Sequence, residues 1–433
     1  MSTIANIATR LRNSRLANDS FWALVGSALG KGLSFLAGVA IARLLGSELY
    51  GEYGTIKNTL MMIAIFSSLG LGYSATKFIA ESMRTNDMQR IADTHHIAML
   101  LTLAMSGVIA LLLLIFAPHV ALWIDAPHLD NTLRLSSIAI VFNAINTTQT
   151  GEMAGLGIYR RLALNSAWAG IFTFASSVIG ALYYGFDGAI VALIVSLIFN
   201  AIINHISIRR VLKTSGPSRG IDRAYMRSIV RFSIPIALQE SLYAITHWIS
   251  IFILIKLAGY AELGVSQAAV QWYAVLLFIP GALRNVALSH LAATNNDHES
   301  NNRILRRLML INFVSTATPA IVVLLLAGYI ASWYGATFDG LSTVLCISVV
   351  TAIVSSMANV LTQMFIAHGR NWTIFTASLL RDGGAVIATY FAILNFGHGA
   401  LCAACSMFAF HIVYFITMFV AYRKINISKQ KHG

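Results

Sequence analysis

Five charged side chains lie deep inside long apolar stretches of the sequence: Lys31, Glu240, Arg284, Arg381 and Asp382. An ionisable group at the centre of a membrane helix costs about 2.5–3.5 kcal/mol on insertion scales, so it usually faces the interior of a helix bundle. A lysine or arginine there can hold an anion, whereas a carboxylate can hold a proton or a cation. The sequence has no glycine-rich phosphate loop, no recognisable catalytic triad and no HExxH run. These charges therefore predict binding rather than catalysis.

The composition excludes a water-soluble fold. Of the 433 residues, 57% are hydrophobic and 11% are charged, whereas a soluble domain is about half apolar and about a quarter charged. The apolar residues come in blocks of about twenty, the length that a helix needs to cross about 30 Å of hydrocarbon. Hydropathy predicts an all-α polytopic fold of about twelve membrane helices, at 20–43, 54–80, 94–116, 132–157, 162–183, 187–208, 228–255, 264–291, 307–330, 341–367, 372–394 and 398–421.

The net charge of +13 is distributed as a topology signal. When the predicted loops alternate between two sides, one side holds about 23 of the 30 lysine and arginine residues. The ends on the other side hold about four, namely Arg43, Lys57, Arg134 and Lys256. Cytoplasmic loops of membrane proteins carry the basic excess. We therefore expect a multi-pass inner-membrane protein with both termini in the cytoplasm, and we do not interpret the charge as a nucleic-acid footprint.

A basic stretch divides the chain into two similar halves. Residues 209–227 form the predicted cytoplasmic linker between a six-helix lobe, 1–208, and a second six-helix lobe with its tail, 228–433. Six helices per half give both halves the same orientation, which is a parallel pseudo-two-fold repeat, and transporters of this design bind substrate between the halves. Three matches at offsets of about 211–213 residues indicate the repeat: Arg43 to Gly51 with Lys256 to Gly264, Gly157 and Ser166 with Gly369 and Ser378, and Gly188-Ala189 with Gly399-Ala400.

Five short motifs, in order along the chain, resemble one known family. They are Ala42–Gly51 (ARLLGSELYG), Ser68–Gly72 (SLGLG), Gly155–Arg161 (GLGIYRR), Phe232–Pro235 (FSIP) and Trp333–Phe338 (WYGATF). Their order and spacing resemble the polysaccharide and O-antigen repeat-unit flippases of the multidrug/oligosaccharidyl-lipid/polysaccharide exporter superfamily. The chain departs from many relatives late in the seventh helix, where it has His247-Trp248 in place of an acidic residue.

The resemblance implies a function and a substrate. The expected function is a flippase that moves an undecaprenyl-pyrophosphate-linked oligosaccharide, an O-antigen or exopolysaccharide repeat unit, from the cytoplasmic to the periplasmic leaflet by alternating access. We expect no enzymatic activity, no cofactor and no metal. The expected partners are the lipid-linked oligosaccharide, membrane lipids and other membrane glycan-assembly proteins, and not nucleic acid.

Two other classes of protein compete with the flippase. A cation-coupled multidrug antiporter of the same superfamily should have a cavity dominated by acids, whereas three of the five deep charges here are basic. A membrane glycan polymerase or ligase would need a sizeable periplasmic loop, and the longest predicted outward loop, 117–131, is short.

The three deep cations are candidate pyrophosphate ligands in a cavity between the lobes. Lys31 is flanked by Gly26, Gly30 and Gly32, so little bulk would screen its ammonium; a structural ion pair is the other interpretation. Arg284 can offer a bidentate fork to phosphate oxygens or extend to the cytoplasmic surface. Arg381 either faces the cavity or pairs with a neighbouring helix.

The two deep acids are candidates for ion coupling or for pairing with a cavity cation. Glu240 is a candidate proton or sodium site, or the partner of a cavity lysine or arginine. Asp382 directly follows Arg381. Because adjacent residues on a helix point in different directions, we do not expect these two to neutralise each other.

The remaining candidates have an ordinary structural interpretation beside the functional one. The pair His95-His96 at the cytoplasmic end of the third helix is expected to be solvated. Aromatic rings can stack on sugars or anchor helices at the membrane interface, and the candidates are Trp248, Trp272 and Tyr273. The cysteines fall inside predicted helices, where packing explains them better than metal or redox chemistry: Cys346, Cys402 and Cys405.

Overall fold

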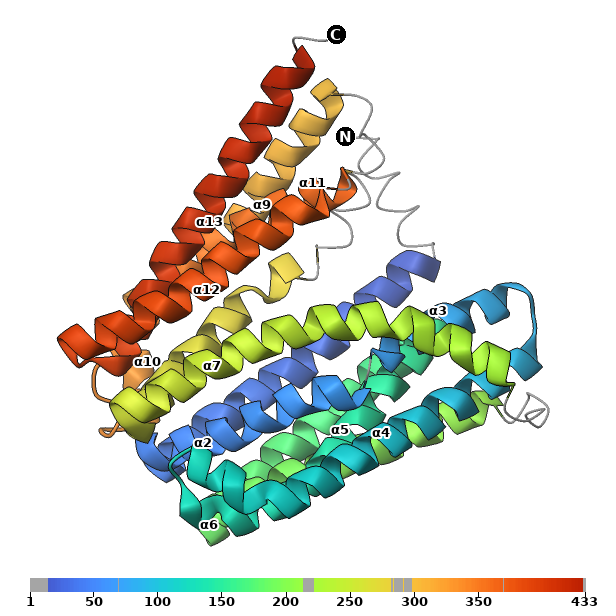
Figure 1. Ribbon diagram of the computed structural model, residues 1–433, viewed down its shortest axis with the longest axis horizontal. Helices are drawn as coiled ribbons and strands as arrows, with labels where there is room; N and C mark the ends of the chain where they lie inside the picture. The colour runs from blue at the N-terminus through green and yellow to red at the C-terminus, as the bar shows by residue number, and fades with distance from the viewer. Residues whose placement is uncertain are drawn as a thin grey trace. The chain divides into compact units, whose positions relative to one another are not determined.

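The computed structural model describes residues 15–68, 70–212, 222–281, 298–368 and 370–430, together with residues 283 and 291. The regular structure in these ranges is helical (Figure 1). In chain order the elements are α2 (Arg15–Ser68), α3 (Leu71–Arg84), α4 (Met88–Trp123), the 3-10 turn η1 (Pro127–Leu129), α5 (Asp130–Gly155), α6 (Tyr159–Leu212), α7 (Arg223–Leu276), α9 (His298–Leu325), α10 (Ala327–Tyr334), α11 (Leu341–Ala367), α12 (Asn371–Phe396) and α13 (Gly399–Gln430).

Three of these helices are too long to be single membrane spans. Helices α2, α6 and α7 contain 54 residues each, which at 1.5 Å per residue is about 80 Å, over twice the thickness of the hydrocarbon layer. Each contains one glycine with non-helical backbone angles: Gly46 (φ 78°, ψ 173°), Gly185 (φ 58°, ψ −133°) and Gly259 (φ 83°, ψ 176°). Glycine adopts a positive φ without steric cost, so the chain turns there and continues as a second segment. The turns that hydropathy predicts near these glycines are therefore present, and the helical structure resumes directly after each glycine instead of after a loop.

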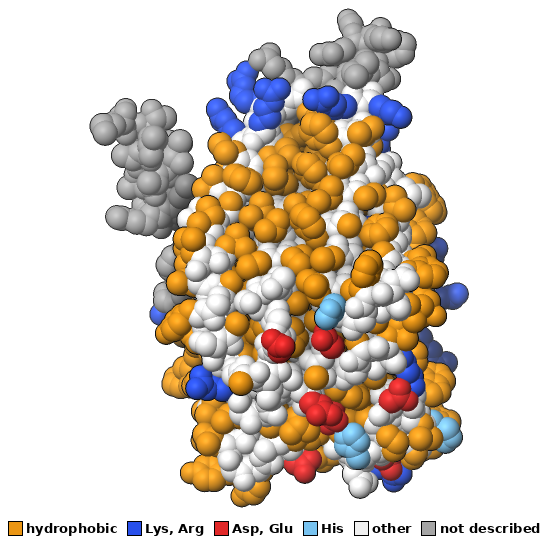
Figure 2. All heavy atoms as spheres, turned by 90° about the vertical axis from the view of Figure 1, so that its left-hand side faces the viewer, with side chains coloured by type: hydrophobic (Ala, Val, Ile, Leu, Met, Phe, Trp, Pro, Cys, Tyr) orange, Lys and Arg blue, Asp and Glu red, His pale blue; other side chains and the backbone are white. Residues whose placement is uncertain are grey.

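The exposed surface of the helices is apolar. Helix α4 exposes a run of large side chains, Leu111, Leu112, Leu114, Ile115 and Phe116, and Figure 2 shows hydrophobic side chains over most of one face, with Lys and Arg gathered at one edge. A patch of this size would be unfavourable in water. Eight helices in the described part of the chain are long and apolar enough to cross a membrane. The predicted all-α polytopic membrane fold is confirmed, and the count of twelve spans stays a prediction.

Two compact units make up the chain. The first unit contains residues 1–44 and 53–248, and the second unit contains residues 45–52 and 249–433. The short segment 45–52 therefore belongs to the second unit, although it lies in the first half of the sequence. The two six-helix lobes and the linker expected from the sequence stay a prediction.

Basic side chains gather at one end of the first unit. Helices α4 and α5 are connected through η1, so the start of α4 lies beside the end of α5. A hydrogen bond between the hydroxyls of Thr94 and Tyr225 (2.7 Å) brings the start of α7 to the same end. A bond from Asn165 Nδ2 to Asn204 Oδ1 (2.9 Å) brings both ends of α6 together. The described basic residues at this end are Lys77, Arg90, Arg160, Arg161, Arg209, Arg210, Arg223, Arg227 and Arg231.

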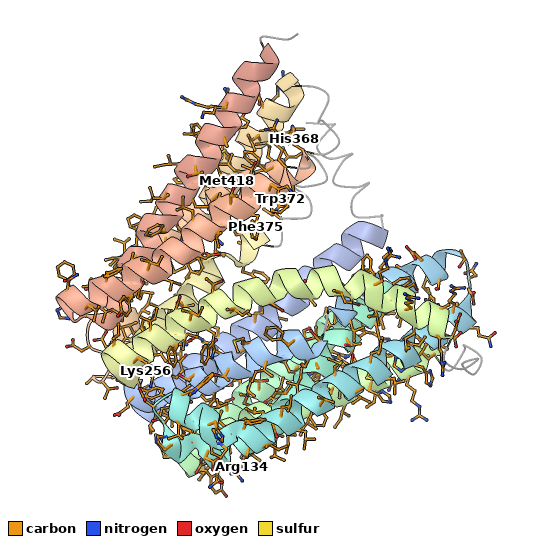
Figure 3. All side chains as sticks on the ribbon, in the orientation of Figure 1. Arg134, Lys256, His368, Trp372, Phe375 and Met418 are labelled. Atoms are coloured by element: carbon orange, nitrogen blue, oxygen red, sulfur yellow. The ribbon has the colours of Figure 1, made fainter. Side chains whose placement is uncertain are left out.

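The opposite end of the first unit has few cations. Arg134, at the start of α5 (Figure 3), forms an ion pair with Asp130 over 2.9 Å.

In the second unit, the hydroxyl of Tyr422 donates to Asn302 Oδ1 (2.6 Å), which joins the end of α13 to the start of α9. The described basic residues near that junction are Arg303, Arg306, Arg307, Arg423 and Lys424.

A buried apolar cluster holds the second unit together at α9, α11, α12 and α13. Phe365 and Met418 are completely buried in it, and Figure 3 labels Met418 on α13. Outside the cluster, Trp372 at the start of α12 is 79% exposed and meets the ring of Phe375 edge-on, with 5.8 Å between centroids. An exposed tryptophan near a helix end is typical of a membrane-interface anchor.

The predicted helix 54–80 is interrupted. Helix α2 ends at Ser68 and α3 begins at Leu71, with Gly70 in the left-handed conformation between them (φ 67°, ψ 14°). The amides of Tyr73 and Ser74 donate to the carbonyl of Gly70 over 3.1 and 3.3 Å, which starts the new helix. The prediction of one continuous helix was wrong, because the apolar sequence continues through the break and hydropathy does not detect it.

Candidate functional site

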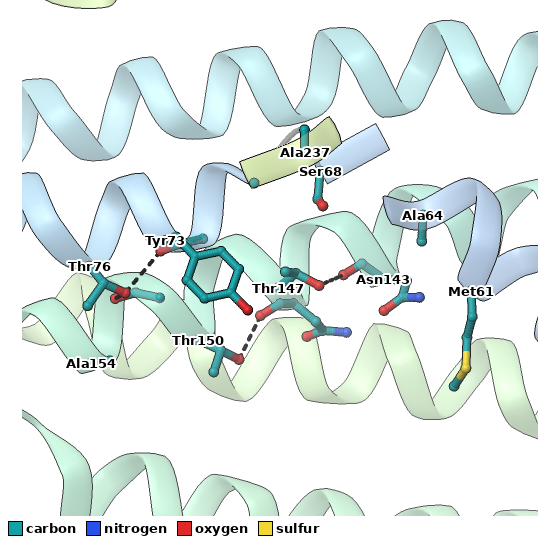
Figure 4. A pocket seen from close by; sticks show the side chains of 14 residues that line it. Met61, Ala64, Ser68, Tyr73, Thr76, Asn143, Thr147, Thr150, Ala154 and Ala237 are labelled. Carbon is teal, nitrogen blue, oxygen red and sulfur yellow. Dashed lines mark hydrogen bonds between the residues drawn. The ribbon is translucent and has the colours of Figure 1, made fainter. Parts of the chain in front are cut away.

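A cavity of about 610 Å³ lies in the first unit, at the break between α2 and α3 (Figure 4). Its walls come from the end of α2, the start of α3, the second half of α5 and one residue of α7, Ala237. All fourteen lining residues are uncharged. Seven are polar, namely Ser68, Tyr73, Thr76, Asn143, Asn146, Thr147 and Thr150; the others are Met61, Ala64, Gly70, Gly72, Gly151, Ala154 and Ala237.

Close packing of α3 on α5 fixes one wall of the cavity. A Cβ on Gly151 would overlap the carbonyl oxygen of Gly72, so only a glycine fits at position 151 without displacing the helix. The hydroxyl of Thr76 lies 2.9 Å from two carbonyl oxygens, that of Gly72 in its own helix and that of Gly151 across the interface in α5, and its hydrogen is shared between them. Small residues and a shared hydroxyl are the usual means of joining helices in lipid, where apolar burial gives no driving force.

Helix α5 presents a row of polar side chains to the cavity. Asn143, Asn146, Thr147 and Thr150 follow the spacing i, i+3, i+4, i+7, which places them on one helix face. The hydroxyls of Thr147 and Thr150 donate to the carbonyls of Asn143 and Asn146 over 3.0 and 2.7 Å (Figure 4). Their oxygens still have lone pairs that can accept hydrogen bonds from a ligand.

One lining side chain is buried and has an oxygen atom without a hydrogen-bond partner among the described residues. Asn146 is 6% exposed, and its amide nitrogen donates to the carbonyl of Leu197 over 2.9 Å. Its Oδ1 atom makes no hydrogen bond with the described residues. A buried acceptor without a partner costs about 1–3 kcal/mol, so a donor from a bound ligand or water would be favourable there.

The lining fits an uncharged polyhydroxylated ligand. Amides and hydroxyls can exchange hydrogen bonds with sugar hydroxyls, and the ring of Tyr73, which is 56% exposed, offers an apolar face for stacking. A pocket that binds a small ligand usually combines an apolar wall with a few placed polar groups. The cavity can therefore exchange hydrogen bonds with a ligand that carries several hydroxyl groups.

The sequence prediction of site residues did not include this cavity. Tyr73 and the α5 row were both missed, although the polar run from Asn143 to Thr150 inside an apolar helix was a readable signal. Lys31 is exposed on the first segment of α2 and does not line the cavity. Gly30, beside it, faces α6, where its Cβ would lie 2.6 Å from the carbonyl oxygen of Ser166. Gly30 is therefore used in helix packing.

Two of the predicted site residues lie outside the described part of the chain. Arg284 is one, and the side chain of Glu240 is the other. Their roles stay predictions.

Arg381 and Asp382 pair with each other, contrary to expectation. The Nε and Nη2 atoms of Arg381 donate to the two carboxylate oxygens of Asp382 over 2.7 and 2.9 Å. The guanidinium also lies over the ring of Tyr414, 4.7 Å from its centroid. The arginine side chain is long enough to reach the carboxylate of the next residue although the two Cβ atoms diverge. The expectation that the two charges do not neutralise each other was wrong.

The aromatic candidates for sugar stacking are hydrogen-bonded in the structure. Trp272 is 9% exposed and donates to the hydroxyl of Tyr334 over 3.0 Å. Trp248 donates to the hydroxyl of Thr59 over 3.2 Å. Burial leaves Trp272 no free ring face for a sugar.

Comparison with solved structures defines the class of fold. A multidrug resistance MATE family transporter of the MOP superfamily, in an inward-facing conformation, superposes with a TM-score of 0.76 at 17% identity, over 94% of this chain and 96% of that one. A MOP superfamily transporter from Pyrococcus furiosus, described by the reversed polarity of its binding pocket, superposes with a TM-score of 0.69 at 16% identity, over 97% and 98% of the two chains. The fold is that of this transporter class.

Sequence comparison identifies the family. The family model described as polysaccharide biosynthesis protein matches residues 40–315, and the chain belongs to this family. The EPS I polysaccharide export inner membrane protein EpsE of Ralstonia nicotianae is 24% identical over 378 residues, 86% of this chain and 85% of that protein. The protein of the same name from Ralstonia solanacearum is 30% identical over 197 residues, 45% of each chain. The family resemblance read from the five motifs is confirmed.

Proposed function

We propose that this protein is an inner-membrane flippase that moves a polyprenyl-pyrophosphate-linked oligosaccharide, such as an O-antigen or exopolysaccharide repeat unit, to the periplasmic leaflet. The observation that carries the proposal is the uncharged cavity of the first unit, whose amides, hydroxyls and exposed Tyr73 ring suit a sugar. Membership of the polysaccharide biosynthesis family and similarity to a polysaccharide export protein support the same substrate class.

The proposed orientation follows from the distribution of cations in each unit. The ends of the first unit differ strongly in basic residues, and the basic end belongs in the cytoplasm. With this orientation the cavity lies on the cytoplasmic side of mid-depth, because its lining on α5 runs from Asn143, at the middle of that helix, to Ala154, one residue before the helix ends. A sugar entering from the cytoplasmic leaflet would reach it without crossing the whole membrane.

The membrane potential already favours transport of an anionic headgroup in the outward direction. An inside-negative potential favours outward movement of an anionic headgroup by about 2.3 kcal/mol per charge per 100 mV, if the charge crosses the whole field. The pyrophosphate would be held by cations, for which Lys31, Arg284 and Arg381 are the proposed ligands, with Glu240 and Asp382 as partners or coupling groups. Partners of this process are membrane lipids and the other membrane proteins of glycan assembly.

Deletion of the gene tests this function. The deletion strain should lose the surface glycan and accumulate lipid-linked repeat units that are protected from membrane-impermeant reagents. Complementation with the wild-type chain should restore the glycan. The same experiment tests the multidrug antiporter, because that protein would leave the glycan intact and its loss would raise sensitivity to toxic cations. An intact glycan in a strain without a second flippase contradicts our proposal.

A further inference from the structure

A histidine and a glutamate form a buried pair at the basic end of the first unit. The Nδ1 atom of His95 lies 2.9 Å from both carboxylate oxygens of Glu152. The side chain of Glu152 is completely buried, and that of His95 is 13% exposed. The expectation of a solvated His95-His96 pair is therefore wrong for His95, because α5 covers the ring and supplies it with a carboxylate.

The burial of the pair favours a proton bound between the two side chains. A carboxylate buried without a counter-charge costs several kcal/mol, so an ionised Glu152 needs the imidazolium form of His95. The other arrangement with one proton is a neutral imidazole that accepts from a protonated carboxyl group, and both arrangements place a carboxyl oxygen at hydrogen-bond distance from Nδ1. A second proton would convert the pair into an imidazolium beside a neutral acid and weaken the attraction between α4 and α5.

The other charged groups near the pair are engaged elsewhere. On α3, Lys77 lies 3.9 Å from Glu81, which is 57% exposed. On α4, the guanidinium of Arg90 lies over the ring of Tyr225 of α7, 4.4 Å from its centroid. The charge that the His95 ring faces is thus the carboxylate of Glu152.

The remaining titratable groups at this end lie toward solvent. His96 is exposed, and its ring meets that of His95 edge-on with 5.7 Å between centroids. Asp93 of α4 is half-buried and has a partner of its own. The basic groups on the flanking ends of α6 and α7 are exposed: Arg160, Arg161, His205, Arg209, Arg210, Arg223 and Arg227.

Helix α5 separates this pair from the cavity. At 100° per residue, Glu152 points about 180° away from the helix face that carries Asn143, Thr150 and Ala154, all of which line the cavity. On the face of α5 that packs against α4, a second contact joins the two helices. The hydroxyls of Thr148 of α5 and Thr102 of α4 lie 2.8 Å apart and form a hydrogen bond. A change in the packing of α4 on α5 therefore displaces a wall of the cavity.

We propose that His95 and Glu152 form a proton-binding site, and that its occupancy is coupled through α5 to binding at the cavity on the opposite face of that helix. The proton site stands on the geometry of the pair alone, whereas its coupling to transport rests on the proposed function. The ligand of the new site is a proton exchanged with the cytoplasm by way of the partly exposed His95.

Histidine NMR of the full chain in lipid nanodiscs tests the proton site. The ring signals of 15N-labelled His95 are assigned by their absence in His95→Gln and are followed as a function of pH. Glu152→Gln should shift the His95 titration to lower pH by one unit or more, because a neighbouring negative charge is gone. Glu81→Gln is the matched control, since it removes an exposed carboxylate at the same end, and should leave the titration within a few tenths of a unit.

An unchanged His95 titration in Glu152→Gln would overturn the proton site. If that variant does not fold, infrared spectra of His95→Gln replace it. The protonated carboxyl band of Glu152 should then persist to a pH at least one unit higher than in the wild type, because the cationic partner is gone. A band with the wild-type pH dependence overturns the proposal equally.

Transport in proteoliposomes tests the coupling. The probe is a fluorescent polyprenyl-pyrophosphate-linked N-acetylhexosamine, and its rate of translocation is measured at several values between about pH 6 and pH 8, where a histidine titrates. We expect the wild type and Glu81→Gln to change rate at least fivefold across this range, and His95→Gln and Glu152→Gln to give flat profiles. A flat wild-type profile, or pH-dependent variants, overturns the coupling. If even the wild type does not move the probe, the proposed function fails while the NMR result still decides the proton site.

Discussion

Gly51 and Gly264 occupy equivalent places on two segments of the second unit that pack against each other. A Cβ on Gly51 would overlap the carbonyl oxygen of Tyr260, and a Cβ on Gly264 would overlap that of Ser47. Ser47 and Tyr260 directly follow the kink glycines of α2 and α7, which share nearly identical backbone angles. The contact is therefore reciprocal, and the repeat found in the sequence has a counterpart in the structure.

This reciprocal contact predicts that neither glycine tolerates a side chain. Gly51→Ala and Gly264→Ala should each destabilise the protein by about 1–3 kcal/mol, the usual cost of inserting a group into a packed interface. The measurement is the midpoint of thermal unfolding of the detergent-solubilised chain, followed by size-exclusion chromatography. Gly32→Ala is the control, because a Cβ at that exposed position has no neighbour within 4 Å. Equal midpoints for Gly51→Ala and the control contradict the prediction.

Accessibility of single cysteines should establish the orientation. In a chain whose three native cysteines are replaced, His128→Cys should react with a membrane-impermeant maleimide in intact cells, because η1 connects the ends that carry few cations. Arg161→Cys lies at the basic end and should react only after permeabilisation. The sequence makes the same prediction for 209–231 and the C-terminal tail in the cytoplasm, with 117–131 and 331–340 outside. The reverse pattern of labelling would remove the charge argument for topology.

Much of the fold could be predicted because it depends on properties that are local in sequence. The length of the apolar blocks gives membrane helices, and the glycines at 46 and 259 end the segments where the hydropathy falls. The break at Gly70 could not be predicted in this way, since apolar residues flank it on both sides. The break lies next to the close packing of α3 on α5 at Gly72 and Gly151, which are far apart in sequence.

The candidate site was harder to predict for the same reason. Charges deep in apolar segments indicated Lys31 and Arg381 as site residues. The cavity is instead lined by neutral groups from four helices. The pairing of Arg381 with Asp382 depends on side-chain torsions, which sequence spacing does not determine. The burial of His95 depends on Glu152, which lies 57 residues further along the chain.

The cavity predicts a specific role for Tyr73. Tyr73→Ala should lower glycan export about tenfold or more in the complemented deletion strain, because it removes the ring on which a sugar would stack, a loss of about 1.4 kcal/mol. Tyr73→Phe should retain most of the export, since the apolar face remains. Tyr183→Ala is the matched control, because Tyr183 is 79% exposed and does not line the cavity. Wild-type export by Tyr73→Ala, at equal membrane abundance, excludes the tyrosine from substrate binding.

The pair in α12 predicts an asymmetry between single and double substitutions. Asp382→Asn should destabilise the chain by about 1.5–3 kcal/mol, since it weakens two charge-assisted hydrogen bonds and leaves the Arg381 guanidinium without a counter-charge. The double variant Arg381→Leu with Asp382→Leu should recover much of this loss, because an apolar pair has no desolvation cost in lipid. Thermal unfolding of the three proteins provides the comparison. A double variant that is less stable than Asp382→Asn would show that the pair itself is stabilising.

The last prediction concerns the anionic headgroup and Lys31, an exposed cation on the first segment of α2. An ammonium acts on phosphate as a point charge, so Lys31→Arg should retain appreciable transport, whereas Lys31→Ala should lose most of it at normal expression. The alanine variant should insert normally, because removal of an intramembrane charge lowers the cost of insertion. Lys77→Ala is the control, since that ammonium lies over the rings of Phe78 and Phe232 at the basic end of the unit. Complementation of the deletion strain, with membrane abundance measured by immunoblot, separates the outcomes. Full glycan export by Lys31→Ala would exclude Lys31 as the pyrophosphate ligand. Other cations would then have to bind the pyrophosphate of a substrate whose sugar occupies the cavity beside Tyr73.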